Sequence, residues 1–390
     1  MRGQKELGLY IHIPFCIKKC LYCDFLSFSS DERIRQLYID TLLEELRGLS
    51  SQLDSAYQVS TVFIGGGTPS ILKAEQAESL LQAVKTSFHL AKEAEITMEA
   101  NPGTVDKAKL EAWRCGGVSR ISLGLQSAND QELRLLGRIH TFQEFLQTYE
   151  MARREGFWNI NVDLISAIPG QTLESWKKTL AAVAGLGPEH ISAYSLIVEE
   201  KTPFHEMYGE GRGKGFPRLP DEDTERAIYE VTEETLLKYG YMKYEISNYA
   251  RQGFECKHNL GYWERREYLG AGLGAASLIG HMRYHNTEDM GEYLEWAGKK
   301  TDIRRELEHL TIEEEMEEFM FLGLRKTEGV SAACFRETFG IDIGRVYGPQ
   351  LDRLGSMGLT AVSGDRIYLT KRGTDLSNQV FVEFMEPKIQ

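Results

Sequence analysis

The sequence predicts an α/β fold: an incomplete (β/α)6 TIM-like barrel, followed by a C-terminal domain that is mainly helical. Two observations support this prediction. Apolar, β-prone segments alternate with amphipathic helical segments through the first half of the chain, and the composition changes after about Asp302. Strands that alternate with helices form parallel sheets with right-handed crossovers. Six such units are too few for a closed eight-stranded barrel, so we expect a barrel that is open on one side.

Six segments of the chain have the character of β-strands. They span residues 9–13, 60–64, 95–99, 119–125, 159–165 and 190–197. The amphipathic segments between them predict helices over residues 31–49, 74–87, 105–115, 131–137, 142–155 and 173–186. In barrels of this kind the loops that follow the strands carry the chemistry. Functional residues should therefore lie just beyond the strand ends.

The composition is that of an ordinary globular protein, with 42% hydrophobic and 26% charged residues. A net charge of −13 argues against a protein that binds nucleic acid, because such proteins need a basic face. No apolar stretch has the length of a signal-peptide core or of a membrane span. We therefore expect a cytoplasmic protein whose thiols stay reduced and can hold iron, with peripheral association with the membrane left open.

Three of the six cysteines lie directly after the first predicted strand. Cys16, Cys20 and Cys23 have the spacing Cys-x3-Cys-x2-Cys, and we call residues 16–23 the cysteine loop. Three thiolates on one loop can bind three irons of a 4Fe–4S cluster and leave the fourth iron open to a ligand. A zinc site would need a fourth ligand, commonly from a second cysteine pair, which is missing here. The loop therefore predicts an iron–sulfur cluster.

Glycine and polar residues follow the other predicted strands. The Gly65–Thr68 turn after the second strand can bring backbone N–H groups close to a carboxylate or a phosphate. Glu99 ends the third strand, where it could accept hydrogen bonds from ribose hydroxyls. Gln126 follows the fourth strand, and Asp163 lies in the fifth. A buried carboxylate needs a partner or a ligand, and Arg138 is one candidate partner for Asp163.

The order of these motifs resembles the oxygen-independent coproporphyrinogen III oxidase group of the radical S-adenosylmethionine (SAM) superfamily. Between Tyr10 and Thr172 the matching motifs are the cysteine spacing, GGGTPS, MEANP, GLQS, GRIH, NVDLI and IPGQT. The resemblance implies a partial barrel of the radical SAM type, in which SAM chelates the open iron through its amino nitrogen and carboxylate. It further implies that one SAM is lined by Tyr10, Gly66 and Glu99, and that the positions of a second SAM are Tyr22, Gly67, Thr68, Gln126, Arg138 and Asp163.

One departure from the oxidase pattern separates two branches of this group. The oxidase has a fourth cysteine two residues after the third, where this chain has Phe25. The Cys-Asp-Phe sequence and the motif HNLGYW, which begins at His258, resemble the HemW haem chaperone branch. That resemblance implies that His258 binds haem iron and that Tyr262 and Trp263 cover the porphyrin face. Cys256 is a rival axial ligand.

The predicted domains are a radical SAM partial barrel over residues 1–240, a segment with the haem motif and connections over 241–300, and a helical domain over 301–390. In the last of these, an acidic helix from Thr311 precedes two short helices, a hairpin around Gly364 and a final helix from Thr374. This order suggests a winged-helix-like domain. Its acidic helix favours a substrate lid or a partner surface over DNA binding.

Three function classes follow from these patterns. The favoured hypothesis is a haem chaperone that carries a SAM-binding 4Fe–4S cluster and delivers haem to client apo-haem proteins. Membrane-bound respiratory enzymes are candidate clients, and a flavodoxin or ferredoxin is a candidate electron donor. The alternative is an oxygen-independent coproporphyrinogen III oxidase. Radical modification of RNA is disfavoured by the acidic composition. No residue is assigned a catalytic role, and SAM cleavage stays an open question.

Overall fold

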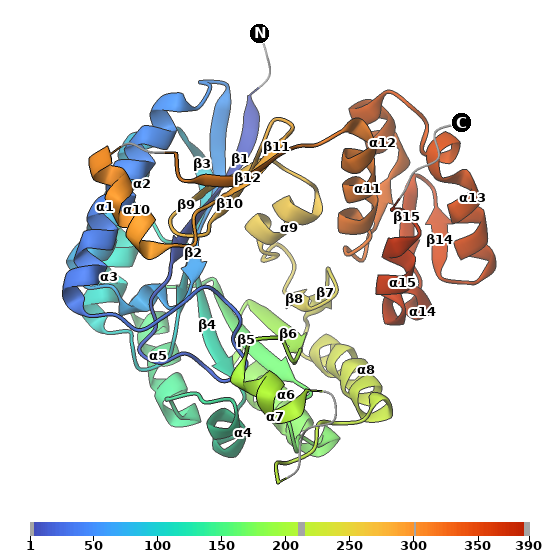
Figure 1. The fold of residues 1–390 in the computed structure, drawn as a ribbon. Helices are drawn as coiled ribbons and strands as arrows, with labels where there is room; N and C mark the ends of the chain where they lie inside the picture. The colour runs from blue at the N-terminus through green and yellow to red at the C-terminus, as the bar shows by residue number, and fades with distance from the viewer. Residues whose placement is uncertain (1–3, 210–214, 300–301, 386–390) are drawn as a thin grey trace.

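Parallel strands in chain order form the centre of the fold. The structure is a computed structural model that describes residues 4–209, 215–299 and 302–385 (Figure 1). Strands β1 to β6 pair side by side, and every pairing among them is parallel. Their bounds are β1 Lys5–Ile13, β2 Tyr57–Gly66, β3 Leu90–Ala100, β4 Arg120–Gln126, β5 Ile160–Ser166 and β6 His190–Ser195. The predicted α/β fold is confirmed, and its sheet has free edges at β12 and β7.

Helices connect these strands along the outside of the curved sheet (Figure 1). They are α1 Glu32–Gln52, the short η1 Pro69–Ile71, α2 Ala74–Ser87, α3 Lys107–Cys115, α4 Asp130–Leu135, α5 Phe142–Arg154 and α6 Leu173–Leu186. Several begin at a side chain that accepts a hydrogen bond from the first turn, as Asp31 does for α1 and Thr141 for α5. Such caps satisfy N–H groups that have no partner within the helix. The helices therefore begin close to the predicted positions.

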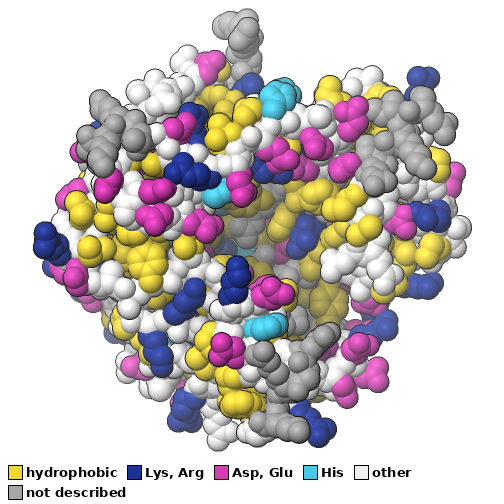
Figure 2. All heavy atoms as spheres, viewed as in Figure 1, with side chains coloured by type: hydrophobic (Ala, Val, Ile, Leu, Met, Phe, Trp, Pro, Cys, Tyr) yellow, Lys and Arg dark blue, Asp and Glu magenta, His cyan; other side chains and the backbone are white. Residues whose placement is uncertain are grey.

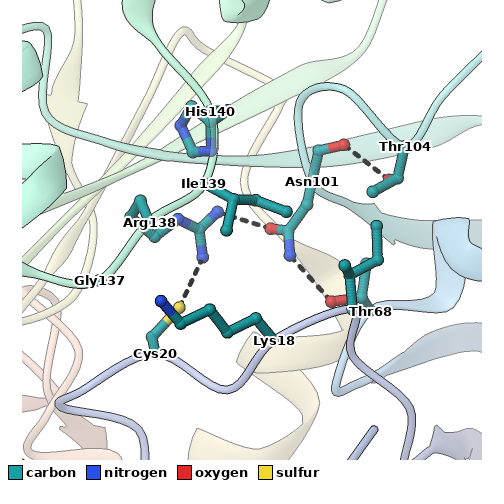
Figure 3. A pocket seen from close by; sticks show the side chains of 10 residues that line it. Lys18, Cys20, Thr68, Asn101, Thr104, Gly137, Arg138, Ile139 and His140 are labelled. Carbon is teal, nitrogen blue, oxygen red and sulfur yellow. Dashed lines mark hydrogen bonds between the residues drawn. The ribbon is translucent and has the colours of Figure 1, made fainter. Parts of the chain in front are cut away.

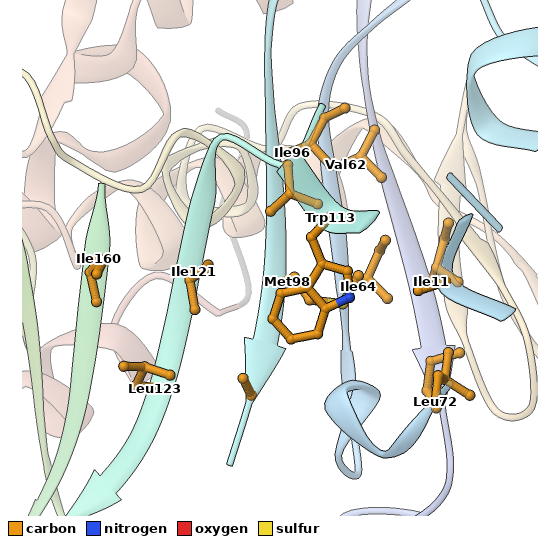
Figure 4. Packing of buried hydrophobic residues seen from close by; sticks show 14 of the residues in the cluster. Ile11, Val62, Ile64, Leu72, Ile96, Met98, Trp113, Ile121, Leu123 and Ile160 are labelled. Atoms are coloured by element: carbon orange, nitrogen blue, oxygen red, sulfur yellow. The ribbon is translucent and has the colours of Figure 1, made fainter. Parts of the chain in front are cut away.

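The main hydrophobic core fills the space between the sheet and these helices (Figure 4). Ile64 of β2 and Met98 of β3 are fully buried, and Trp113 of α3 packs over their side chains. Strand β4 is buried at every position. A parallel strand with both faces covered has this pattern, so polar side chains on β3 to β5 must find partners inside the protein or in a cavity.

The chain between β6 and the C-terminal part adds strands to both edges of the same sheet. Its elements are α7 Pro203–Tyr208, α8 Glu222–Lys238, β7 Met242–Lys243, β8 Asn248–Ala250, α9 Lys257–Trp263, β9 Tyr268–Ala271, β10 Ala276–Ile279, β11 Met282–Asn286, α10 Met290–Lys299 and β12 Arg304–His309. Strand β8 runs antiparallel to β6, whereas β9 runs parallel to β1. Strands β10 to β12 continue beyond β9 in antiparallel order. None of these later strands was predicted from the sequence.

The C-terminal part has its own hydrophobic core. Its elements are α11 Ile312–Gly323, β13 Val330–Ser331, α12 Ala332–Phe339, α13 Ile343–Ser356, β14 Thr360–Ser363, β15 Arg366–Leu369, α14 Lys371–Asp375 and α15 Ser377–Val382. The helical domain and the hairpin around Gly364 are confirmed, and β13 pairs with β15 beside that hairpin. The predicted last helix is two short helices, which meet at Leu376.

Helix α9 lies between the barrel strands and the C-terminal helices (Figure 1). It contacts β2 on one side and α11 on the other. Figure 2 shows that the same face of the molecule is hollowed near its centre. None of the described helices is both long enough and apolar enough to cross a membrane.

Candidate functional site

A large cavity opens where the parallel strands end. It holds about 1380 Å³, including the space at its open mouth. Its lining combines residues of the cysteine loop with residues at or just beyond the ends of β2, β3 and β4, on β5, and on and after β6. Of the predicted site residues, the cavity brings together Cys16, Cys20, Cys23, Tyr22, Gly66, Gly67, Thr68, Glu99, Gln126, Arg138 and Asp163. Side chains far apart in the sequence therefore share one site, as expected for residues at the carboxyl ends of parallel strands.

The three thiols of the cysteine loop are free and partly exposed to this cavity. The Thr68 hydroxyl donates a hydrogen bond to Cys16 Sγ over 3.4 Å, and Arg138 Nη1 donates one to Cys20 Sγ over 3.5 Å. Burial raises the pKa of the Cys23 thiol. Among the described residues, no three His, Cys, Asp or Glu side chains are placed to hold a single metal ion. Thiolates that bind one cubic cluster each hold a different iron, so they need not converge on one point. The donor set therefore fits a cluster.

Arg138 holds the loops at this end of the barrel together (Figure 3). Its Nη2 donates to Asn101 Oδ1 over 2.7 Å and to the Gly124 carbonyl over 2.6 Å. Asn101 Nδ2 in turn donates to the Thr68 hydroxyl over 2.8 Å. These bonds join the ends of β2, β3 and β4 to the cysteine loop. Asn101 was given no role from the sequence, although its position two residues after Glu99 could have indicated one.

Glu99 lies in the cavity wall beside the glycine turn. Its Oε2 accepts a hydrogen bond from the Gly66 backbone N–H over 3.0 Å. Gly66 has a φ of 109°, and a Cβ there would lie 2.4 Å from the His12 ring, so only glycine fits this close approach. Burial, together with the charge of Asp163, raises the pKa of Glu99 to about 8. At neutral pH this carboxyl group is mostly protonated in the free protein.

Asp163 has neutral partners. Its Oδ2 accepts a hydrogen bond from the Ser122 hydroxyl, and its Oδ1 accepts one from Asn161 Nδ2, both over 2.8 Å. The candidate partner Arg138 instead binds Asn101, Gly124 and Cys20. Asp163 is therefore held by Ser122 of the neighbouring strand β4 and by Asn161 of its own strand, and it lines the cavity.

A buried chain of hydrogen bonds leads from Asp163 to α9. Asn161 Oδ1 lies 2.6 Å from His190 Nδ1, and His190 Nε2 lies 2.8 Å from the Tyr244 hydroxyl. That hydroxyl accepts a bond from the Cys256 backbone N–H over 3.2 Å at the start of α9. Sequence reasoning missed this chain because its members come from distant segments with no recognisable spacing.

Tyr10 does not line the cavity. Its hydroxyl shares a 2.9 Å hydrogen bond with His12 Nδ1, and its ring stacks on Phe63.

Phe25 lies at the cavity mouth, where its side chain is 62% exposed. The position that carries a fourth cysteine in the oxidase pattern is thus occupied by an exposed apolar ring.

His258 is buried in the first turn of α9, outside the cavity. It is 3% exposed, its Nδ1 lies 2.8 Å from the Thr61 hydroxyl, and its Nε2 lies 3.0 Å from the Tyr262 hydroxyl. Burial and the charge of Arg120 lower the pKa of His258 to about 3, so the imidazole is neutral. Both ring nitrogens have protein partners in this structure.

The other residues considered for haem binding lie at the two ends of α9. Trp263 lies at its C-terminal end, with the Arg325 guanidinium over its ring at 4.5 Å. Cys256 is fully buried, and burial raises the pKa of its thiol to about 11. A thiol that stays protonated is a poor metal ligand, so its burial and raised pKa disfavour Cys256 as the rival axial ligand.

Known proteins resemble this chain over nearly its full length. The radical SAM superfamily model matches residues 10–183, and the HemN C-terminal domain model matches residues 310–376. "Heme chaperone HemW" of Lactococcus lactis is 38% identical over 98% of both chains. The protein of the same name from Bacillus subtilis is 37% identical over 96% of this chain and 98% of its own, and that from Escherichia coli is 35% identical over 97% and 98%.

A solved structure has the same fold. It is the coproporphyrinogen III oxidase HemN from Escherichia coli, a radical SAM enzyme, with a TM-score of 0.84 over 98% of this chain and 90% of that chain. At 24% sequence identity this likeness establishes the fold alone. The full-length relatives decide the family: the chain belongs to the radical SAM superfamily and, within it, to the HemW heme chaperone family.

Proposed function

We propose that the protein is a haem chaperone that binds haem and delivers it to client apo-haem proteins. The observation that carries the proposal is the near full-length relationship to proteins named "Heme chaperone HemW". Phe25 supports it, since an exposed phenylalanine stands where the oxidase pattern has its fourth cysteine. The oxidase reading rests on a likeness of fold, which many functions share.

The cavity at the strand ends is the proposed site of the cofactors. Cys16, Cys20 and Cys23 would hold a 4Fe–4S cluster, and SAM would chelate the open iron of that cluster. Thr68 and Arg138 donate hydrogen bonds to thiol sulfurs, and such bonds would stabilise thiolates. The remaining cavity residues predicted for SAM would surround it, with Glu99 accepting from its ribose. Tyr10 lies outside the lining of this cavity, so its effect on SAM would be indirect.

Haem binding is proposed at the motif on α9, with His258 as the axial ligand. A neutral imidazole is the form that ligates metals, and burial keeps His258 neutral. To reach iron, Nε2 must give up its hydrogen bond with Tyr262, after which the Tyr262 and Trp263 rings could cover the porphyrin. Thr61 would keep Nδ1 engaged and so fix the orientation of the ring.

The partners are proposed on the same basis. Haem is the ligand, and membrane-bound respiratory enzymes are candidate clients, which would bring the protein to the membrane surface as a peripheral protein. A flavodoxin or ferredoxin is the proposed electron donor for the cluster. Nucleic acid is not among the proposed partners, because the chain carries a net charge of −13.

One experiment separates the chaperone from the oxidase. The anaerobically reconstituted protein is incubated with coproporphyrinogen III, SAM and a reductant, and the products are analysed, while haem is titrated into a parallel sample. We expect a Soret shift on haem addition and no decarboxylation. Efficient decarboxylation, together with haem binding that is indifferent to His258→Ala, would overturn the proposal.

A further inference from the structure

Arg325 has an unusual position at the junction between the barrel and the C-terminal part. Its guanidinium lies 4.5 Å from the ring centre of Trp263 and 5.9 Å from that of Phe381. Within the described ranges it forms no ion pair. Glu245 is the acidic group that acts on its charge, and the Glu245 carboxylate accepts from the Ser247 backbone N–H. A guanidinium held between aromatic rings is stabilised by them but keeps its hydrogen-bond donors.

Two buried donors at this junction lack an acceptor. Neither Arg325 Nε nor the indole Nε1 of Trp263 has a hydrogen-bond partner among the described residues. Buried donors are nearly always paired, because an unpaired one destabilises the folded protein. Two orphans on side chains that stack against each other indicate a missing acceptor. A carboxylate has two oxygens and a negative charge, and it is the group that a guanidinium binds best.

Arg325 also lines a second cavity, which is separate from the cofactor site. This cavity lies between α8 and the C-terminal part and holds about 1040 Å³, including its open mouth. Apolar side chains of Leu237, Ile246, Leu324 and Leu369 contribute to its wall. It therefore offers an apolar surface and a cation, beside the carboxyl groups of Glu230, Glu233, Glu234 and Glu245.

The other cations of this cavity already have carboxylate partners. Lys243 pairs with Glu233 over 3.7 Å, and Lys371 pairs with Glu230 over 3.1 Å. Lys326 pairs with Glu264 and Glu328. Among the lining residues that the structure describes, Arg325 is left as the cation available to an incoming anion.

We propose that Arg325 binds a propionate carboxylate of the tetrapyrrole, in the cavity between α8 and the C-terminal part. This inference rests on the proposed function and names the part of the protein that recognises the polar edge of its ligand. The carboxylate supplies an acceptor to the Arg325 guanidinium, which lines the cavity, while the apolar wall contacts the porphyrin. Of the haem motif, Trp263 acts indirectly, because its ring packs against the guanidinium that binds the carboxylate.

The test compares haemin with haemin dimethyl ester, in which both propionates are blocked. Affinities are measured by absorbance titration for the wild type, Arg325→Gln, Arg325→Lys and the control Arg336→Gln. Arg336 is an exposed arginine of α12, so the control removes the same charge from the same part of the protein. A charge-assisted bond to a buried group is worth about 1.5–3 kcal/mol, which corresponds to roughly 10- to 150-fold in affinity.

We expect the wild type and Arg336→Gln to bind haemin about tenfold or more tightly than the ester. Arg325→Gln should bind both ligands with similar affinity, and Arg325→Lys should keep part of the preference because it keeps the charge. Equal affinity of the wild type for acid and ester would overturn the inference and leave the proposed function standing. An equal loss of affinity for haemin and for the ester in Arg325→Gln would also overturn the inference and leave the proposed function standing. A wild type that binds neither ligand would instead refute the proposed function. The wild-type comparison needs no substitution and does not depend on how the variants fold.

Discussion

Replacing Glu99 by glutamine should change how the stability of the protein depends on pH. Burial and the charge of Asp163 raise the pKa of Glu99 from its ordinary value of 4.5 to about 8. In the unfolded chain the group titrates at the ordinary value. Between about pH 4.5 and 8 the unfolded chain therefore loses a proton that the folded protein keeps. By linkage, the free energy of unfolding falls as the pH rises through this window and levels off above it.

The size of the effect follows from the shift. Each pKa unit corresponds to about 1.4 kcal/mol, so the full shift is worth on the order of 5 kcal/mol. Roughly half of this, about 2.5 kcal/mol, falls between pH 6 and pH 9. Glutamine has the same shape and can accept the Gly66 N–H bond, but it does not ionise. The Glu99→Gln variant should therefore lack this component of the pH dependence.

The assay is urea unfolding of the anaerobic protein without SAM at pH 6 and pH 9. Glu93→Gln, an exposed substitution on the same strand, serves as the control for the loss of a carboxylate. From pH 6 to pH 9, the free energy of unfolding of the wild type and of Glu93→Gln should fall by about 2.5 kcal/mol more than that of Glu99→Gln. If all three proteins show the same change, Glu99 is not a neutral buried acid, and the account of the cavity wall given above is wrong.

Two further predictions concern the cluster and the haem motif. Alanine in place of any one cysteine of the cysteine loop should abolish the absorbance of the reconstituted cluster. The control variants Cys115→Ala and Cys334→Ala should keep this absorbance, because both cysteines lie outside the cavity. A cluster that persists in a loop variant would contradict the ligand assignment. If His258 is the axial ligand, His258→Ala should lose the Soret shift. Tyr262→Phe frees Nε2 of His258 from its hydrogen bond, so this variant should keep or strengthen the shift. Equal spectra in both variants would indicate that the imidazole only packs the core.

Sequence reasoning succeeded where the signal is local. Strand β4 has apolar residues at alternate positions, Ile121, Leu123 and Leu125, and α5 begins with a Thr141–Glu144 capping box, so both elements were predicted near their observed bounds. It failed for the later strands of the sheet. The sequence of β12 is RRELEH, and most of its side chains face solvent. Such a segment becomes a strand because β11 offers it a partner, which no pattern of its own residues can show.

The same contrast holds for the site. Glu99 and Asp163 could be found because motifs at strand ends place them in a cavity. The partners of Asp163 could not be found in this way, because Ser122 is one hydroxyl side chain and Asn161 one amide side chain among many. For His258 the motif indicated the residue but not its surroundings. Thr61 and Tyr262 occupy the two ring nitrogens of His258. Thr61 lies 197 residues away in the sequence, whereas Tyr262 lies one helical turn away.

The pairing of β1 with β9 has a consequence for the synthesis of this protein on the ribosome. Gly8 pairs with Tyr268, so the first strand is made long before the strand that covers its edge. At roughly 5–20 residues per second, translation takes roughly 13 to 50 seconds to cover that distance. During this time β1 can pair with β2 while its other side offers free N–H and C=O groups to any passing strand. Nascent chains stalled before β9 should thus rapidly exchange the β1 amides that face away from β2, and they need protection that the finished protein does not.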